Sequence, residues 1–322
     1  MSVGVDEEPL FSVAHRGRRA VLTCHQGRLT EGDPPNALSS IAACVEAGAQ
    51  RVELDVTFTA DDVPVLSHDE IFQVRGRKVP ARTVASEEVP HLPRLAEVVP
   101  LFAGWGCLLQ VDLKRRGPMT PGEVRALAEV LRPLGPNVIV GSQAHWNLRM
   151  LATEGLTVAF DPWLHLRYVP SSAPRWWTAG APRRTGTWGF RDDAAYAGDR
   201  GWSFERYLAA RLDDLLALVP GCVELMVDIG TILRIGELGL PLGRELAQRG
   251  VALAAWTVRS FRGQETIDLV CRLLELGATT VITDVPLEIW MAMRGSEAVA
   301  DHAGATPSPP AVPVAPAPEC RM

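Results

Sequence analysis

The sequence predicts an α/β fold, a closed TIM (β/α)8 barrel that carries an aromatic-rich insertion. First, short apolar segments of strand type alternate with helical segments, a pattern typical of parallel βαβ units, about eight of which close a barrel. Second, the 322 residues, with 47% hydrophobic content, suffice for one large core. Third, polar residues follow several predicted strands, at the end where barrel enzymes gather their functional side chains.

The predicted elements run in order from residue 20 to residue 283. Each strand is a short, mostly apolar run, and helical segments fill most of the gaps. Strands are expected at 20–24, 50–56, 63–67, 107–113, 137–141, 156–160, 222–228, 251–256 and 279–283. Helices are expected at 36–47, 122–133, 144–154, 204–218, 232–249 and 263–276. Because the strands outnumber those of a barrel by one, 63–67 is interpreted as a short accessory strand.

One barrel domain is expected between two flanking segments. We predict an N-terminal extension at 1–19, the barrel at 20–300, and a disordered tail at 301–322, whose Pro- and Ala-rich text cannot bury a core. Residues 162–204 interrupt the pattern with five of the nine tryptophans and with six arginines against three aspartates. This segment is either a lid or substrate wall over the barrel mouth or an insertion packed against the barrel side.

Charge and hydropathy argue against several classes of protein. A net charge of −6 disfavours a nucleic-acid binder that works by neutralising phosphates, so no nucleic-acid partner is expected. No stretch is long enough to span a membrane, and the first residues lack the apolar run of a signal peptide. The six cysteines are scattered without the spacing of a metal site. We therefore expect a cytoplasmic protein with no integral membrane segment.

The most informative motif is RVELDV, which contains Glu53 and Asp55. Side chains on a strand alternate between its two faces, so both carboxylates point at one spot. Two like charges buried side by side need a compensating positive charge, and a divalent cation is the leading candidate. The alternative is a pair of solvated acids on an exposed strand face.

Two further motifs place polar groups at the ends of other strands. VPVLSHD puts His68 at the end of a short strand, and LLQVDLK puts Asp112 and Lys114 on one face of another. The carboxyl ends of parallel barrel strands meet on one side of the molecule. These residues are therefore expected to converge with Glu53 and Asp55 on one pocket.

In their order and spacing, these motifs resemble the glycerophosphodiester phosphodiesterases of the phospholipase-C-like TIM-barrel superfamily. Members of that family carry His-Arg-Gly after a strand, then Pro-Glu-Asn-Thr, Glu-x-Asp, Thr-x-Asp-Gly-x-Pro-Val with His-Asp, and Glu-x-Lys. The resemblance runs from about residue 20 to residue 290. The corresponding text here is AVLTCHQG (20–27), PPNALSSIAACVEAGAQ (34–50), VELDV (52–56), FTADDVPVLSHD (58–69), QVDLK (110–114), AAWTV (254–258) and GATTVITDVP (277–286).

The resemblance leaves two candidates for the first catalytic histidine. His15 stands in a literal His-Arg-Gly triplet, whereas His25 is followed by Gln26 and Gly27. We prefer His25, because it follows the stronger strand and lies eleven residues before Asn36, close to the spacing in the family. The remaining histidines have no motif context and are interpreted as packing or surface residues: His91, His145, His165 and His302.

The resemblance implies a metal-dependent phosphodiester hydrolase with a small-molecule phosphodiester as substrate. Its cofactor would be a divalent cation, Mg²⁺ or Ca²⁺, held by Glu53, Asp55 and Asp112. His25 and His68 would act as acid and base on opposite sides of the phosphate.

Four other residues would complete the site. Lys114 would stabilise the anionic transition state, Gln26 and Arg28 would contact the phosphate, and Trp256 would form an apolar wall for the alcohol. Structural alternatives remain: His68 as a strand-end hydrogen-bonding residue, and Trp256 as ordinary barrel core.

The sequence departs from the family pattern at three positions. Gln26 replaces the phosphate-binding arginine, Pro35 replaces the glutamate of the turn, and Asp112 replaces the glutamate of Glu-x-Lys. Without that guanidinium, phosphate binding must depend on the metal ion, Lys114 and Arg28.

These departures keep other functions open. Asp112 is also reminiscent of the phospholipase D toxins, which cyclise their product, so a cyclising phosphodiesterase is one alternative. A catalytically weak barrel that binds a phosphorylated ligand is a second, and a metal-dependent lyase or aldolase is a third. The sequence does not indicate the oligomeric state.

Overall fold

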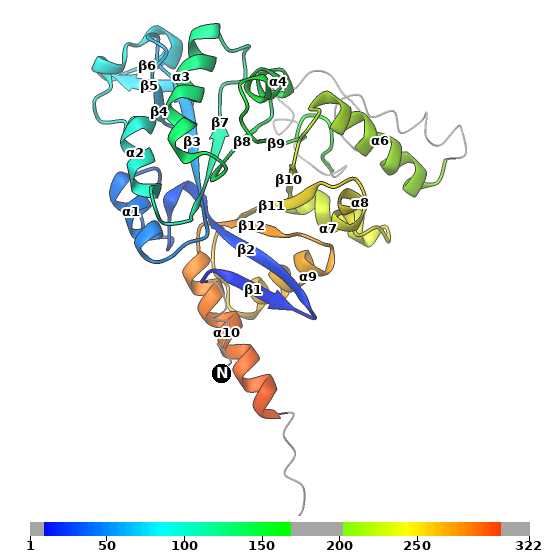
Figure 1. Ribbon diagram of the computed structural model, residues 1–322. Helices are drawn as coiled ribbons and strands as arrows, with labels where there is room; N and C mark the ends of the chain where they lie inside the picture. The colour runs from blue at the N-terminus through cyan, green and yellow to red at the C-terminus, as the bar shows by residue number, and fades with distance from the viewer. Residues whose placement is uncertain (1–9, 169–201, 304–322) are drawn as a thin grey trace, which may run out of the picture.

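The computed structural model describes residues 10–168 and 202–303, with side chains as far as residue 294. Eight parallel strands form its centre, and helices surround them (Figure 1). They are β2 (Arg18–Cys24), β3 (Arg51–Phe58), β7 (Leu108–Leu113), β8 (Val138–Ser142), β9 (Val158–Phe160), β10 (Glu224–Asp228), β11 (Ala252–Val258) and β12 (Thr280–Thr283). Each pairs with the next, and β12 pairs with β2 to close the ring, which confirms the predicted TIM barrel.

Four further strands lie outside this ring. β4 (Pro64–Leu66) pairs antiparallel with β3, as expected for the accessory strand. β1 (Ser12–His15) pairs antiparallel with β2, and β5 (Ile71–Val74) and β6 (Arg77–Pro80) form a separate hairpin. The sequence did not predict these three strands. Each has only four residues, without a clear alternation of apolar and polar side chains that would distinguish it from a loop.

The helices cover the outside of the barrel, and two corrections apply to them. They are α1 (Leu38–Glu46), α2 (Leu95–Phe102), α3 (Pro121–Leu131), α4 (His145–Thr153), α6 (Phe204–Leu218), α7 (Ile229–Glu237), α8 (Leu242–Ala247), α9 (Gln264–Glu275) and α10 (Pro286–Ala303). The helix predicted at 232–249 is wrong: it is divided into α7 and α8, because Gly239 has a positive φ of 90° and Pro241 follows. α2 and α10 were missed.

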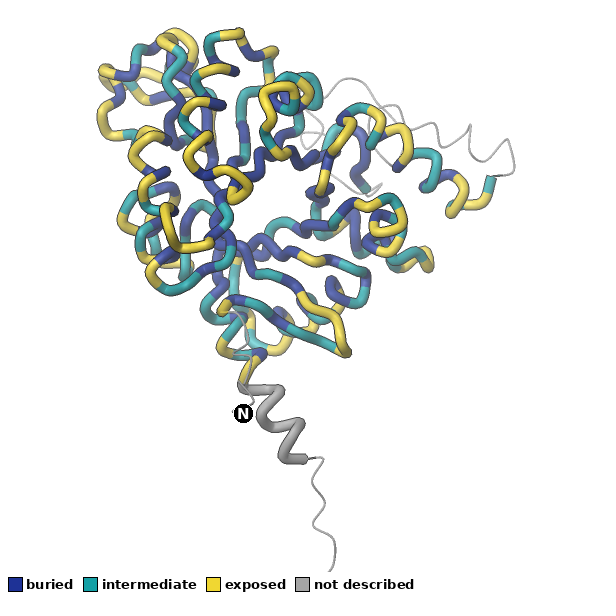
Figure 2. Tube along the Cα trace, viewed as in Figure 1, coloured by how far each residue is buried: buried dark blue, intermediate teal, exposed yellow. Residues whose placement is uncertain are grey.

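Alternation along β3 sorts its side chains into two environments. Val52, Leu54 and Val56 belong to the main core, whereas Arg51, Glu53 and Asp55 lie on the opposite face, inside the barrel. Figure 2 shows that buried residues follow the strands around the ring. A buried charge inside a barrel needs a partner there, so the inward positions of β3 determine what the other strands must supply.

The inside of the barrel changes character along its axis. Near the amino end, the Arg51 guanidinium is paired with Glu224 (Nη1 to Oε2, 2.9 Å) and donates to Gln110 Oε1 at 2.9 Å. Ile139, Ala159, Met226 and Ala254 form a small apolar cluster. Glu53 and Asp55 follow Arg51 along β3 toward the carboxyl end, where the predicted polar residues are expected.

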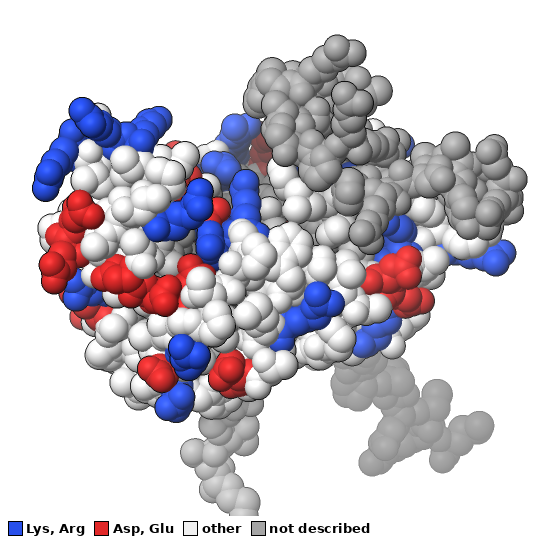
Figure 3. All heavy atoms as spheres, turned by 90° about the horizontal axis from the view of Figure 1, so that it is seen from above, with Lys and Arg blue, Asp and Glu red and all other residues white. Residues whose placement is uncertain are grey.

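Several predictions concern residues outside the described ranges. Most of the segment 162–204 lies there, as do residues 1–9 and 304–322, so the lid, the extension and the tail remain predictions. Among the described residues, no helix is both long enough and apolar enough to cross a membrane. On the face shown in Figure 3, basic and acidic side chains form small, separate groups divided by uncharged residues.

Candidate active site

A tight turn after β2 presents His25 and Gln26 at the barrel mouth. Gln26 and Gly27 both have positive φ, 54° and 68°, so the chain reverses within a single 3-10 turn. A Cβ on Gly27 would lie 2.6 Å from Cγ1 of Ile41 in α1, which makes glycine necessary at this point. The backbone N–H of Asn36 donates to Gln26 O at 2.7 Å and holds the turn closed.

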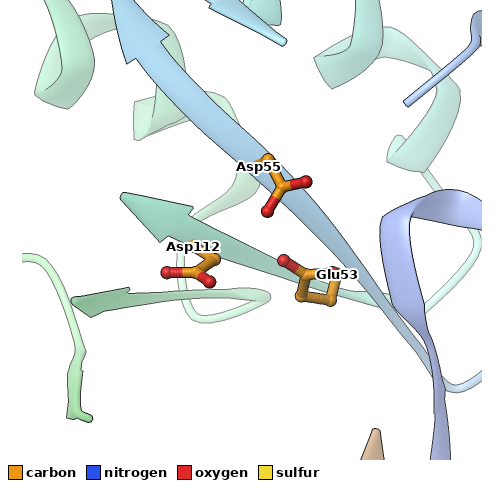
Figure 4. A group of neighbouring side chains, drawn as sticks. All are labelled: Glu53, Asp55 and Asp112. Atoms are coloured by element: carbon orange, nitrogen blue, oxygen red, sulfur yellow. The ribbon is translucent and has the colours of Figure 1, made fainter. Parts of the chain in front are cut away.

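Three carboxylates converge at the same end of the barrel. Glu53 and Asp55 are buried, with 2% and 0% exposure, and Asp112 stands directly opposite Asp55 on the neighbouring strand β7. One oxygen from each lies within 4.8 Å of the others, in an arrangement that could hold a metal ion (Figure 4). The prediction that Glu53 and Asp55 share one face is confirmed, and the alternative of an exposed strand is wrong.

Asp55 is the most fully paired of the three acids. Lys114 Nζ lies 2.9 Å from Asp55 Oδ1, while the side-chain amides of Gln26 and Asn36 donate to Oδ2 at 2.6 and 2.9 Å. Burial would raise the pKa of Asp55, but the charge of Lys114 and the hydrogen bonds from Lys114 and Asn36 together lower that pKa. Lys114 also contacts Asp112 Oδ2 at 2.6 Å, so one ammonium bridges two carboxylates.

Glu53 is less well compensated. Its Oε2 accepts a hydrogen bond from the Gln26 backbone N–H at 2.8 Å, but its buried Oε1 has no hydrogen-bond partner among the described residues. Burial, and then the negative charge of Asp55, raise the pKa of Glu53 to about 8. An orphaned buried oxygen beside two further carboxylates is what a hard divalent cation requires, so these residues fit such an ion.

His25 contacts both the acid cluster and a residue that the sequence analysis missed. Its Nδ1 donates to Asp284 Oδ1 at 2.6 Å, and its Nε2 lies 3.8 Å from Glu53 Oε2. Arg28 Nη1 lies 3.4 Å from the same Asp284 oxygen. Burial would lower the pKa of His25, but the negative charges of Glu53 and Asp284 raise it above its ordinary value.

The other two histidines with motif context have different surroundings. His68 follows β4, its side chain is 61% exposed, and its Nδ1 lies 3.0 Å from Asp69 Oδ1. His15 pairs in register with Arg18 at the start of β2 and lies 3.3 Å from Glu275, at the opposite end of the barrel from the acids. Of the two candidates for the first histidine, only His25 is therefore near the carboxylates.

These side chains surround one pocket with a volume of about 1000 Å³. Asp55 lies behind the surface of the pocket. The other predicted site residues all line it: His25, Gln26, Arg28, Glu53, His68, Asp112, Lys114 and Trp256. The indole Nε1 of Trp256 is buried and has no hydrogen-bond partner among the described residues.

The pocket wall also contains polar residues that the sequence analysis did not select. Asp161 Oδ2 accepts from Gln143 Nε2 at 3.0 Å, and burial followed by the charge of Asp112 raises the pKa of Asp161 to about 7. Asp161 and Asp284 each come directly after a predicted strand. The rule that identified Asp112 and Lys114, polar residues at strand ends, would have found both if applied to every strand.

Comparisons with known proteins agree with this geometry. A model of the glycerophosphoryl diester phosphodiesterase family matches residues 15–288. No curated protein matches the sequence significantly.

Solved structures with the same fold are numerous, although their sequences are distant. A phosphodiesterase from Oleispira antarctica, in complex with the product sn-glycerol-3-phosphate, has a TM-score of 0.56 at 16% identity, over 85% of this chain and 96% of that chain. A glycerophosphodiester phosphodiesterase from Parabacteroides distasonis has a TM-score of 0.58 at 16% identity, over 86% and 97%. Another from Thermotoga maritima has a TM-score of 0.52 at 18% identity, over 83% and 96%.

The family model covers most of the chain, including every strand of the barrel and the whole acid cluster. The chain therefore belongs to the glycerophosphoryl diester phosphodiesterase family.

Proposed function

We propose that this pocket hydrolyses glycerophosphodiesters with the help of a divalent cation. One observation carries the proposal: the unpaired oxygen of Glu53 lies in a three-carboxylate cluster, next to a histidine that Asp284 holds in place. The solved complex of the Oleispira enzyme with sn-glycerol-3-phosphate supports a glycerol phosphate product.

Glu53, Asp55 and Asp112 would hold the ion, since all three offer oxygen, the ligand that both Mg²⁺ and Ca²⁺ prefer. When bound, the ion supplies positive charge that polarises a phosphodiester oxygen. Lys114, which bridges two of these carboxylates, contributes a second positive charge beside the phosphate. Glu53 Oε1 and Asp55 Oδ1 are both buried without a hydrogen-bond partner among the described residues, although Lys114 Nζ lies 2.9 Å from Asp55 Oδ1, so both carboxylates have an oxygen to offer an ion.

His25 would transfer the proton from its Nε2. Because Nδ1 donates to Asp284, the other ring nitrogen faces the acid cluster and is available to a substrate. In hydrolysis, the attacking oxygen forms a bond to phosphorus and gives its proton to one histidine, while the bond to the leaving oxygen breaks and that oxygen takes a proton from the other. His68, which lines the same pocket, would be the second histidine.

Substrate contacts would come from Arg28 and Trp256. Gln26 directs its side-chain amide to Asp55, so it supports the acid cluster rather than replacing the family's arginine on the phosphate. Arg28 is half-buried beside Asp284, within the pocket wall, and can offer its guanidinium to a phosphate oxygen. Trp256 would provide the apolar wall. We also propose that the barrel domain extends from residue 20 to residue 300, and that the protein acts in lipid metabolism in the cytoplasm.

The test is to follow glycerophosphoglycerol by ³¹P NMR with Mg²⁺, with Ca²⁺ and with EDTA. We expect a metal-dependent phosphomonoester signal, at least ~10²-fold weaker in His25→Ala and in Asp112→Asn. His15→Ala is the matched control and should retain activity, since His15 lies at the other end of the barrel. A cyclic phosphodiester signal would instead establish the cyclising alternative, and no turnover with either metal would contradict the proposal.

A further inference from the structure

The charges that line the pocket are unequally paired. Four acids in the wall lie beside a basic side chain of the described residues: Asp69 beside His68, Glu70 beside Arg115, Asp112 beside Lys114, and Asp284 beside His25. The other two, Glu53 and Asp161, accept hydrogen bonds from amide groups and lie near Asp112, at the proposed metal site. Outside the proposed metal site, the acids of the wall therefore already have basic partners within the protein.

Three basic side chains in the same wall have no such partner among the described residues. Lys78, Arg116 and Arg259 line the pocket, all three are exposed, and none has an ion pair or side-chain hydrogen bond in the part of the chain that the structure describes. They come from β6, from the loop after β7 and from the loop after β11, so they approach the pocket from separate elements. A ligand at the mouth meets unpaired positive charge from several directions.

The pocket is also large for a glycerol phosphate. Its volume of about 1000 Å³ lies at the upper end of the range of small-molecule sites, roughly 300–1000 Å³. Glu53, Asp112 and Lys114, which the proposed function assigns to the scissile phosphate, occupy only one part of the wall. Room remains for a head group to reach the three cations.

We propose that the preferred substrate carries a second anionic group, a phosphomonoester or a carboxylate, on its head-group alcohol. The proposal rests on the proposed function, which it makes more specific. Lys78, Arg116 and Arg259 bind the second anion while the acid cluster, His25 and Lys114 act on the phosphodiester. A cationic head group would face like charges at the mouth, and among the described lining residues only Trp256 has an aromatic face to offer it.

The experiment compares kcat/KM on glycerophosphodiesters that differ only at the head group: glycerol, glycerol bearing a terminal phosphate, glycerate, and choline. We expect the phosphate or the glycerate substrate to exceed the glycerol substrate by roughly tenfold at low salt, as two or three partly exposed charge pairs would give, with choline lowest. The advantage should shrink as ionic strength rises. The phosphate and carboxylate arms show which anion is preferred.

The decisive variant replaces the three cations together: Lys78→Gln, Arg116→Gln and Arg259→Gln. The ratio of kcat/KM for the anionic substrate to that for the glycerol substrate should fall toward one. A matched control removes the same net charge at exposed arginines outside the pocket wall, Arg75→Gln, Arg77→Gln and Arg125→Gln, and should keep the wild-type ratio.

Binding separates a failure of this inference from a failure of the proposed function. Calorimetry with the four substrates uses His25→Ala, which should consume them at least ~10²-fold more slowly. This substitution is placed in the wild-type protein, in the pocket triple variant and in the control triple variant. Tighter binding of an anionic head group, lost in the pocket triple variant alone, supports the inference even if no turnover is found. Equal binding of all four, preference for choline, or equal loss in the control triple variant would overturn it while metal-dependent hydrolysis of the glycerol substrate could still stand.

Discussion

Asp284 determines which nitrogen of His25 carries the hydrogen. Its Oδ1 accepts a hydrogen bond from Nδ1 at a distance of 2.6 Å, which in the proposed mechanism leaves Nε2 free to exchange a proton. Asp284→Asn replaces the acceptor with a group that can also donate, so the imidazole loses its preferred tautomer. We expect kcat to fall by ~10²-fold with KM changed only a few-fold. Steady-state kinetics and ¹⁵N NMR of the imidazole check both; a normal tautomer with lower kcat would contradict this role.

Gln26 shows how one substitution can change the balance of a site. Its amide contacts Asp55 at 2.6 Å, at the position where the family carries arginine. Gln26→Arg adds a charged donor at the rim of the pocket. A charged hydrogen bond to the phosphate would stabilise the transition state by ~1–3 kcal/mol, so kcat/KM on glycerophosphodiesters with small head groups should rise accordingly. Gln26→Met, which lacks a donor, is the control and should show no gain. Kinetics over a head-group series measure it, and equal values for all three proteins would count against it.

Asp161 is expected to make the metal-free protein less stable as pH rises. Its pKa of about 7 in the folded state lies above the ordinary 3.8, so the folded state binds more protons between these values. The free energy of unfolding therefore falls through that window, by ~1.4 kcal/mol per pH unit at most. Asp161→Asn removes this loss, so its stability relative to wild type should grow from pH 4 to pH 7 and then level off. Urea unfolding in EDTA measures it; a pH-independent difference would refute it.

At the scale of elements, the turn after β2 joins the site to the outer helices. Gly27 approaches Ile41 in α1 and has a φ of 68°, whereas Gly17 has a similar φ of 74° with nothing within 4 Å of its Cβ position. Both Gly→Ala variants carry the positive-φ strain of ~1–2 kcal/mol, but only Gly27→Ala adds a clash worth a further ~1–3 kcal/mol. Chemical denaturation measures the difference in the free energy of unfolding between the two variants. Equal losses of stability would show that α1 shifts to relieve the clash.

How far the elements could be predicted depended on the range of their interactions. The barrel strands, with Glu53, Asp55, Asp112 and Lys114, follow from local alternation and strand ends, which one sequence contains. The pairing of Asn36 with Asp55 and of His25 with Asp284 joins residues 19 and 259 positions apart, and no local pattern encodes it. The hairpin β5–β6 was missed because its strands are largely exposed and lack an apolar period.

For the whole molecule, the proposed metal site at the acid cluster predicts that stability depends on a divalent cation. A cation that binds only the folded state stabilises it by ~2.7 kcal/mol at a hundred times its Kd. We expect Mg²⁺ or Ca²⁺ to raise Tm in a concentration-dependent way and EDTA to reverse the rise. Glu53→Gln should lose most of this rise, because the substitution removes the negative charge of the carboxylate that has the unpaired oxygen. Thermal unfolding over a metal titration measures this; identical shifts in both proteins would place the ion elsewhere.

The ion pair between Arg51 and Glu224, near the amino end of the barrel, has a consequence for how the molecule could be divided. β3 and β10 are the second and sixth strands of the ring, so the pair reaches across its diameter. A fragment holding the first four strands contains Arg51 without Glu224, and burying that arginine unpaired would cost several kcal/mol. Only the completed ring can therefore form this pair, so we expect neither half of the barrel to retain it alone.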